Sequence, residues 1–205
     1  MRLGLLADLH EDVEMLERAI DRLERLGVDR YVMLGDVFDR GDATQLDRVA
    51  ELLEGVGAIG VWGNHDFGLC CGELDDLALR YSARTLRYMR SLRGRIEIDG
   101  CLFSHIEPAL DPSLLEDLWG GDLPPNTPER AAASFAAMPH RLMFMGHIHC
   151  WIAVRPGEVL PWRAEGPLRL APPDRYLVVV HAVRDGWCAH FDTTTHLLTP
   201  IALIG

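Results

Sequence analysis

The sequence predicts an α/β fold, and two features of the chain carry this prediction. Up to residue 64, short apolar runs alternate with amphipathic segments of helical spacing. Such a strand–helix alternation predicts right-handed crossovers and a largely parallel sheet. From residue 95 onward the chain is instead rich in short β runs separated by turns, so a second group of strands is expected there.

The segments of the N-terminal half have the periodicity of regular elements. Apolar runs that end in a polar residue predict strands over residues 2–8, 30–36 and 58–64. Apolar residues at helical spacing, followed by glycine, predict helices over 12–26 and 45–54. In open α/β sheets, sites form beyond the carboxyl ends of the strands, so the polar residues that end these runs are candidates for a shared site.

The second half is predicted to be mixed. Helices are expected over 73–92 and 129–137, and Asp99-Gly100 favours a hairpin. The Pro- and Gly-rich stretch 108–128 is predicted to be an irregular insertion near the site, and Asp185-Gly186 a turn between two strands. The expected strands are residues 95–99, 101–105, 142–146, 151–155, 176–183, 187–192 and 196–203.

Length, composition and charge limit the class of protein. A chain of 205 residues fits a single domain over 1–205 with a full-sized core. No apolar stretch could span a membrane, and the N-terminal run is too short for a signal peptide, so a cytoplasmic protein without a membrane partner is expected. Five irregularly spaced cysteines favour reduced thiols over a disulfide framework. The net charge of −11 disfavours binding to duplex nucleic acid.

Short polar motifs carry the candidate chemistry. In extended chain, residues i and i+2 point to the same side, so the Asp-x-His and His-x-His pairs can each face one metal cluster. Carboxylate, imidazole and amide ligands suit Mn²⁺, Fe or Zn²⁺ without any thiolate. The motifs are, in chain order, Asp8-Leu-His10, Gly35-Asp-Val-Phe-Asp-Arg-Gly41, Gly63-Asn-His-Asp66, His105 at a strand end, and Gly146-His-Ile-His149.

This set of motifs resembles the calcineurin-like metallophosphoesterase superfamily, over residues 3 to 149. The Gly35–Gly41 motif is similar to that of the protein-phosphatase branch, whereas the short chain and the Asp-Leu-His start resemble small bacterial phosphoesterases. The resemblance implies a four-layer αββα sandwich, in which two mixed β-sheets lie face to face with helices outside. The β-rich C-terminal third agrees with the second sheet.

The resemblance also implies roles for individual residues. His65 would be the general acid, Asp39 would orient it, and Arg40 would hold a phosphate oxygen, with Asn64 and His65 also binding substrate. Two divalent transition-metal ions would share a hydroxide nucleophile, with Mn favoured over Fe, Zn or Ni. One ion would be held by Asp8, His10, Asp36 and His149, and the other by Asp36, Asn64, His105 and His147.

Each candidate residue also has a structural role open to it. Asp8 could cap the following helix, Gly63-Asn64 could form only a turn, and His105 could be a hydrogen-bonded core histidine. Asp39 could belong to a turn and Arg40 to the surface. The metal-site interpretation therefore rests on the joint occurrence of these residue types at predicted strand ends.

The substrate is the most open part of the prediction. The protein-phosphatase branch has Gly where this chain has Glu11, and a phosphate-holding Arg where it has Trp62. Core packing is one interpretation of Trp62, Trp119 and Trp151, and a substrate-stacking wall is the other. The tryptophans and the departures from the branch leave the choice between monoesters and diesters open.

The leading expectation is hydrolysis of a small phosphomonoester or phosphodiester, such as a nucleotide or a phosphopeptide. The alternatives are protein-phosphatase-like activity, dinucleoside polyphosphate hydrolysis, a metal-dependent nuclease, and a non-catalytic scaffold on the same fold. The chain retains every expected ligand and His65, which argues against the scaffold. No pattern in the sequence predicts an oligomeric state.

Overall fold

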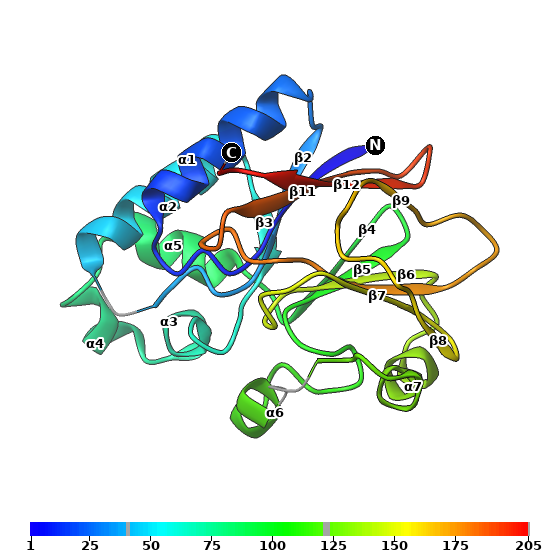
Figure 1. The fold of residues 1–205 in the computed structure, drawn as a ribbon. Coiled ribbons are helices and arrows are strands. Elements are labelled where there is room, and N and C mark those ends of the chain that lie inside the picture. Colours follow the sequence, from blue (N-terminus) through cyan, green and yellow to red (C-terminus); the bar gives the residue numbers. More distant parts are fainter. Residues whose placement is uncertain (40–41, 121–123, 205) are drawn as a thin grey trace.

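The computed structural model describes residues 1–39, 42–120 and 124–204, except the side chains of residues 74 and 75. Two six-stranded sheets lie face to face, and helices cover their outer faces (Figure 1). The expected αββα sandwich of two mixed sheets is confirmed. None of the helices in the described part of the chain is long and apolar enough to cross a bilayer.

The first sheet contains the predicted parallel strands. β1 pairs in parallel with β2, and β2 pairs in parallel with β3, while β11 joins β1 in the antiparallel direction. Its strands are, in spatial order, β3 (Ile59–Val61), β2 (Arg30–Leu34), β1 (Arg2–Leu6), β11 (Trp187–Asp192), β12 (Leu197–Ala202) and β9 (Leu168–Arg169).

The second sheet is also mixed. β5, β6 and β10 run parallel, and antiparallel strands flank them on both sides. The hairpin expected at Asp99-Gly100 is confirmed, with both residues at positive φ. Its strands are, in spatial order, β4 (Arg95–Ile98), β5 (Cys101–Ser104), β6 (Leu142–Met145), β10 (Tyr176–Val179), β7 (Ile152–Arg155) and β8 (Glu158–Val159).

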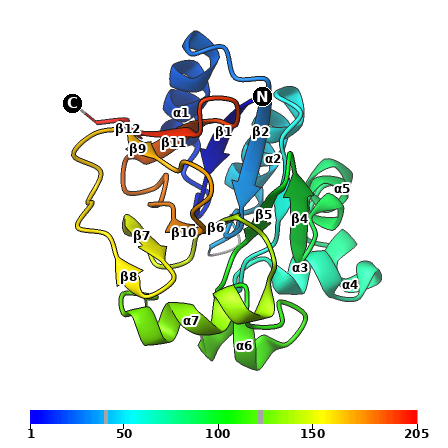
Figure 2. The same cartoon turned by 90° about the vertical axis from the view of Figure 1, so that its right-hand side faces the viewer.

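The helices pack against the two outer faces. Asp12 begins α1 by accepting the Met15 N–H, and Asp42 begins α2 in the same way. Figure 2 shows α6 and α7 at the end of the molecule opposite α1, which is also their place in Figure 1. The helices are α1 (Val13–Arg25), α2 (Ala43–Gly55), α3 (Phe67–Cys71), α4 (Leu74–Ala78), α5 (Ala83–Ser91), α6 (Leu115–Gly120) and α7 (Pro128–Ala137).

Three apolar layers separate the four layers of backbone. Leu3 and Leu5 of β1 point between the sheets, where they pack with Phe103 and Phe144 of the second sheet. Leu6, on the other face of β1, packs under the helices. Because side chains alternate along a strand, one buried strand supplies two of these layers. The strands that position the site are therefore fixed from both sides.

The prediction of a single helix over 73–92 is wrong. The chain forms α4 and α5 there instead, after the short α3. Ser82 interrupts the segment because its side chain accepts the Thr85 N–H at 3.1 Å and so begins a new helix. A local capping signal outweighs the apolar periodicity at this point.

Two further expectations need correction. The stretch 108–128 is not irregular throughout, because α6 forms within it after Asp111, whose carboxylate accepts the Ser113 N–H in a turn. Asp185-Gly186 does form a turn, but the strands on either side of it do not pair. β10 lies in the second sheet and β11 in the first, so the chain crosses between sheets here.

The thiols agree with the expectation from the sequence. All five cysteines are free, and Cys70, Cys101 and Cys188 are buried.

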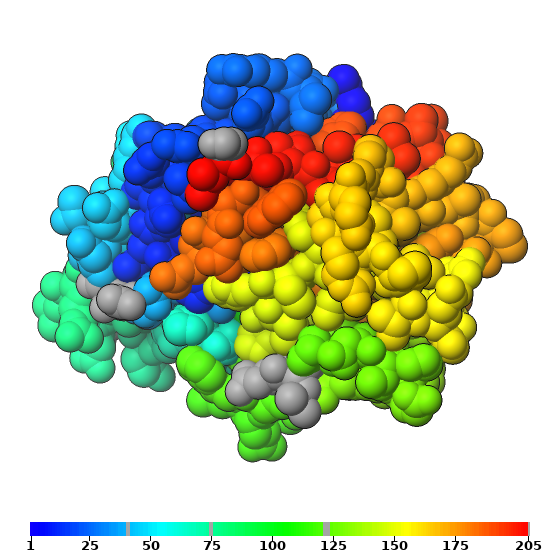
Figure 3. All heavy atoms as spheres, in the orientation of Figure 1, coloured from blue at the N-terminus to red at the C-terminus, as the bar shows by residue number. Residues whose placement is uncertain are grey.

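Figure 3 shows that the part of the chain after residue 150, coloured yellow to red, occupies much of one face of the molecule. This C-terminal part contributes strands to both sheets.

Candidate metal centre

The candidate ligands come from strand ends of both sheets. Asp8 follows β1 by two residues and Asp36 follows β2 by two residues, while His105 follows β5 directly. Asp8 is joined to the loop after β6, because its carboxylate accepts the His147 N–H at 3.1 Å. The seven expected ligands thus gather at one edge, where the two sheets meet.

Most of the ligand positions have an unusual backbone conformation. Positive φ angles occur at Asp8 (51°), His10 (46°), Asp36 (55°), His147 (72°) and His149 (48°). Left-handed conformations of residues other than glycine cost roughly 1–3 kcal/mol each and cluster at functional sites. Backbone hydrogen bonds hold them here, such as Asp8 N–H to the Gly35 carbonyl and His10 N–H to the Asp36 carbonyl, both at 3.0 Å.

Two motif glycines allow this close approach. A Cβ atom at Gly63 would lie 2.1 Å from Oδ1 of Asp36. A Cβ atom at Gly35, which has φ of +92°, would lie 2.5 Å from Nδ1 of His105. No side chain fits at these distances. Asp36 therefore requires a glycine at position 63, and His105 requires one at position 35.

One group of ligand atoms is formed by Asn64, His105 and His147. Nδ1 of His105 lies 2.7 Å from the Leu34 carbonyl oxygen, so this nitrogen carries the proton and donates. In the neutral ring that metal binding requires, Nε2 of His105 presents a lone pair to Oδ1 of Asn64 at 2.9 Å, and Nδ1 of His147 lies 3.1 Å from both atoms. Converging acceptors of this kind repel each other unless a proton or a cation lies between them.

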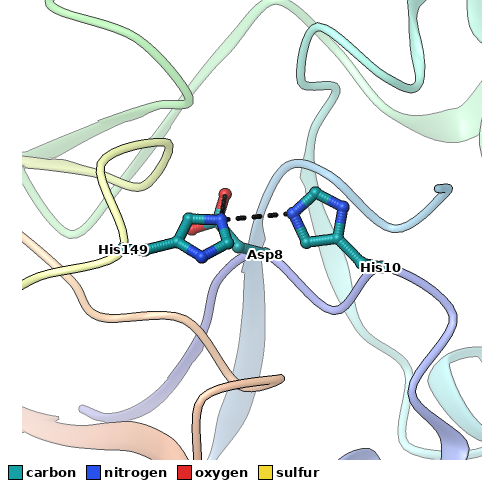
Figure 4. Close-up of side chains that lie close together, drawn as sticks. All are labelled: Asp8, His10 and His149. Carbon is teal, nitrogen blue, oxygen red and sulfur yellow. Dashed lines mark hydrogen bonds and ion pairs between the residues drawn. The ribbon is translucent and has the colours of Figure 1, made fainter. Parts of the chain in front are cut away.

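A second group is formed by Asp8, His10 and His149 (Figure 4). Nε2 of His10 and Nε2 of His149 are 3.2 Å apart, and Oδ1 of Asp8 lies 3.7 Å from the latter. Nδ1 of His149 is 3.0 Å from Oδ2 of Asp185, which fixes the proton on Nδ1. The Nε2 lone pair of His149 therefore points toward its two neighbours.

Asp36 lies between the two groups. Its Oδ2 atom is 3.8 Å from Nε2 of His10 and 3.4 Å from Nε2 of His105. Its other oxygen, Oδ1, accepts the His65 N–H at 3.1 Å. One carboxylate oxygen thus faces ligand atoms of both groups, while the second is tied to the backbone.

The pKa values of the buried ligands also favour a bound cation. Burial raises the pKa of the Asp8 carboxyl well above its usual range. Burial alone would lower the pKa of His105, but the carboxylates of Asp36 and Asp8 raise it to about 9. Burial lowers the pKa of His10 to about 4, so this imidazole is neutral near pH 7. Carboxyl groups and imidazoles buried this close together hold protons between them. A bound cation would replace those protons, so the arrangement favours a metal ion.

His65 and Asp39 lie beside the second group. The His65 ring meets the His10 ring edge to face, with centroids 5.0 Å apart. Oδ1 of Asp39 lies 4.0 Å from Nδ1 of His65 and equally 4.0 Å from Nδ1 of His10. Asp39 is therefore placed between two imidazoles rather than on His65 alone. Arg40 lies outside the described residues.

These donors fit divalent transition-metal ions. Imidazole nitrogens, carboxylate oxygens and one amide oxygen form the set, with no thiolate. Two imidazoles have their second nitrogen bound to an acceptor, Leu34 O for His105 and Asp185 for His149. Such outer partners are typical of metal-binding histidines because they fix the tautomer and the orientation of the ring.

Comparison with known proteins gives the family. Residues 1–169 match the family model of the calcineurin-like phosphoesterase superfamily domain. The chain belongs to the calcineurin-like phosphoesterase superfamily. The resemblance carried by the motifs is confirmed, and membership implies divalent metal ions and hydrolase activity in general.

The similarity to other proteins extends over nearly the whole chain. An uncharacterized protein of Methanocaldococcus jannaschii is 25% identical, over 90% of this chain and 78% of its own length. A metallophosphoesterase from Sphaerobacter thermophilus has a TM-score of 0.75 at 24% identity, covering 98% of this chain and 87% of that one. A structure described as an archaeal phosphodiesterase has a TM-score of 0.56 at 12% identity, covering 98% and 99%. At these identities the two structures show a shared fold.

Asp66 of this superfamily member has a structural role. Its buried carboxylate accepts the N–H groups of Val37 at 3.2 Å, Phe38 at 2.9 Å and Gly63 at 2.9 Å. Burial and the nearby Asp36 raise its pKa to about 6. Asp66 thus ties the loop after β2 to the loop after β3, and so fixes Asp36 relative to Asn64.

Two site residues were not predicted from the sequence. Asp185 contacts His149, as described above, and Nη1 of Arg184 lies 3.7 Å from Oδ2 of Asp39. Both belong to the turn between β10 and β11, and they reach the centre only because the chain crosses between sheets there. An Asp-Gly pair indicates a turn, and nothing in its spacing to the motifs could have placed it at the metal centre.

The three tryptophans near the motifs have different places. Trp62 is half-buried under the helical layer, and its indole N–H donates to the Pro112 carbonyl at 2.9 Å. Trp151 is buried between the sheets. Trp119 is 50% exposed, and its ring centroid lies 5.3 Å from that of His65. Core packing therefore describes Trp62 and Trp151, but not Trp119.

Loss of the Asp185 carboxylate is expected to weaken metal binding. The change Asp185→Ala should lower the affinity for Mn²⁺ by about 10–100-fold, because His149 loses the partner that fixes its tautomer. Calorimetric titration with Mn²⁺ measures this. Asp174→Ala is the matched control, since Asp174 is a similarly exposed carboxylate that pairs with Arg155. An Asp185→Ala affinity within twofold of the wild type would show that Asp185 does not support the ligand.

Proposed function

We propose that the protein is a phosphoesterase that uses two divalent metal ions to hydrolyse phosphomonoesters or phosphodiesters. The observation that carries this proposal is the position of Asp36, whose single oxygen Oδ2 faces imidazoles of both ligand groups. Asp8, His10, Asp36 and His149 would hold one ion. Asp36, Asn64, His105 and His147 would hold the other. Mn is favoured, and Fe, Zn or Ni are alternatives.

The bound ions would supply an activated water and neutralise charge on the phosphoryl oxygens. The chain supplies the rest. His65 is 29% exposed at its side chain and stands next to both Asp36 and His10, which suits a group that protonates the leaving oxygen. Asp39, whose Oδ1 lies 4.0 Å from Nδ1 of His65, would orient the His65 ring. Asn64 would contact the phosphoryl group as well as an ion.

The surroundings of the site favour a small substrate with low negative charge. At the position where the protein-phosphatase branch has Arg, this chain has Trp62, which supplies no guanidinium and is packed under the helices. The hollow of about 670 Å³ beside His10 and Asp39 is mostly acidic, because the carboxylates of Glu14, Glu17 and Asp42 outnumber the one described guanidinium, that of Arg184. A monoanionic diester is repelled less by this wall than a monoester dianion, so diesters are the favoured class within the proposal.

The experiment is a substrate panel with Mn²⁺-loaded protein. Nitrophenyl phosphate, bis-nitrophenyl phosphate, a dinucleoside polyphosphate, a phosphopeptide and single- and double-stranded DNA would be compared, with Asp36→Asn as the background. We expect cleavage of the diester, with weaker cleavage of the monoester and none of duplex DNA. Cleavage of no compound in the panel above the background would rule out the proposal and favour a non-catalytic scaffold. Cleavage of the phosphopeptide or the polyphosphate alone would favour those alternative activities.

A further inference from the structure

Trp119 is the one aromatic residue among the large exposed apolar side chains of the described part of the chain. It lies on α6, at the lower edge of the molecule in Figure 1. The neighbouring residue Leu118 is fully buried and anchors this short helix. A half-exposed indole on an anchored helix presents a flat apolar face at a fixed position, where a ligand ring can pack against it.

The position of Trp119 relative to His65 suggests what covers it. His65 lies next to two rings, that of His10 at 5.0 Å and that of Trp119 at 5.3 Å. His10 belongs to the ligand groups, and Trp119 lies outside them. His65 therefore stands between the metal centre and an exposed indole.

We propose that Trp119 stacks against a planar aromatic group carried by the leaving alcohol of the substrate. This inference rests on the proposed function, in which His65 protonates the leaving oxygen. A general acid must come within about 3 Å of the atom it protonates. Whatever is attached to that oxygen then extends past His65, where it meets Trp119.

The side of the site away from Trp119 is less suitable for the aromatic group of the leaving alcohol. The hollow beside His10 and Asp39 is lined mostly by carboxylates, including Glu14 and Glu17, and the His10 imidazole is the one ring among its described lining residues. An indole face accepts any flat ring, including a nucleobase, and discriminates poorly by hydrogen bonding. The substrate class that fits is therefore an ester of an alcohol with an aromatic ring, such as a nucleoside, in preference to an alkyl ester.

The test uses two esters that differ only in the ring. Benzyl and cyclohexylmethyl phosphate esters, made as monoesters or methyl diesters according to the class cleaved, have leaving alcohols of the same size and similar acidity. For the wild type we expect kcat/KM for release of benzyl alcohol to exceed that for cyclohexylmethanol by about tenfold, the size of a good ring–ring contact. Trp119→Ala should bring this ratio to about one. Trp119→Phe should keep most of it.

The control is Leu115→Ala, an equally exposed apolar residue of the same helix, which should leave the ratio unchanged. Calorimetric binding of benzylphosphonate and cyclohexylmethylphosphonate to the Mn²⁺-loaded variants gives a second measurement that needs no turnover, and it should show the same pattern. An unchanged ratio in Trp119→Ala, or an equal loss for both esters, would overturn the inference. Hydrolysis of no ester by any variant would instead show that the proposed function has failed.

Discussion

Replacement of Asp36 by asparagine is expected to lower kcat/KM for phosphate esters by roughly 10³-fold or more, equivalent to ~4 kcal/mol of transition-state stabilisation. Oδ2 of Asp36 faces Nε2 of His10 and Nε2 of His105, so this residue would bind both ions. An amide retains the shape but removes the negative charge that two cations require. The Mn²⁺ content should fall from two ions per chain to one or fewer.

The control for this substitution is Asp21→Asn, on the exposed face of α1, where Asp21 pairs only with Arg25 among the contacts described. Its activity and metal content should equal those of the wild type. Steady-state kinetics and elemental analysis of the dialysed proteins measure both quantities. If Asp36→Asn kept two ions and more than a tenth of the activity, a bridging role for Asp36 would be excluded.

Removal of the His65 imidazole is expected to have the second large effect. His65→Ala should lower kcat for an alkyl ester by about 10²–10⁴-fold, because the alkoxide then leaves without a proton. The loss should be much smaller for a nitrophenyl ester, since nitrophenolate leaves readily without protonation. The effect should thus depend on the basicity of the leaving group, which kinetics with a graded series of esters would measure.

Metal content tests a second role that the geometry allows for His65. A ligand nitrogen of His65 lies within 4.8 Å of ligand atoms of His10 and Asp36, so it could also hold an ion. We expect His65→Ala to retain two ions per chain, like the control His140→Ala, whose imidazole pairs with Glu97. Loss of an ion, with equal loss of activity for all leaving groups, would make His65 a ligand instead of an acid.

The ligands at strand ends could be predicted from the sequence alone. Asp8, Asp36 and Asn64 follow parallel neighbours β1, β2 and β3, and pairing of those strands forces their ends together. The division of the ligands into two groups came instead from the family resemblance, because strand periodicity does not show which side chains share an ion. The distances around Asp36 are compatible with that division.

The remaining site residues depend on contacts between distant segments. Asp185 reaches His149 because β10 and β11 belong to different sheets, and Trp119 reaches His65 because a helix forms in a Pro- and Gly-rich stretch. Periodicity and turn signals describe only local structure. They cannot show which sheet a strand joins, or where a short helix packs.

The most direct test of the account is electron paramagnetic resonance of the wild-type protein loaded with Mn²⁺, combined with elemental analysis. A shared Asp36 carboxylate predicts two Mn²⁺ ions per chain, with the spectrum of a magnetically coupled pair. The same spectrum should be lost in Asp36→Asn. One ion per chain, or two ions with the separate six-line spectra of uncoupled Mn²⁺, would contradict a centre bridged by Asp36.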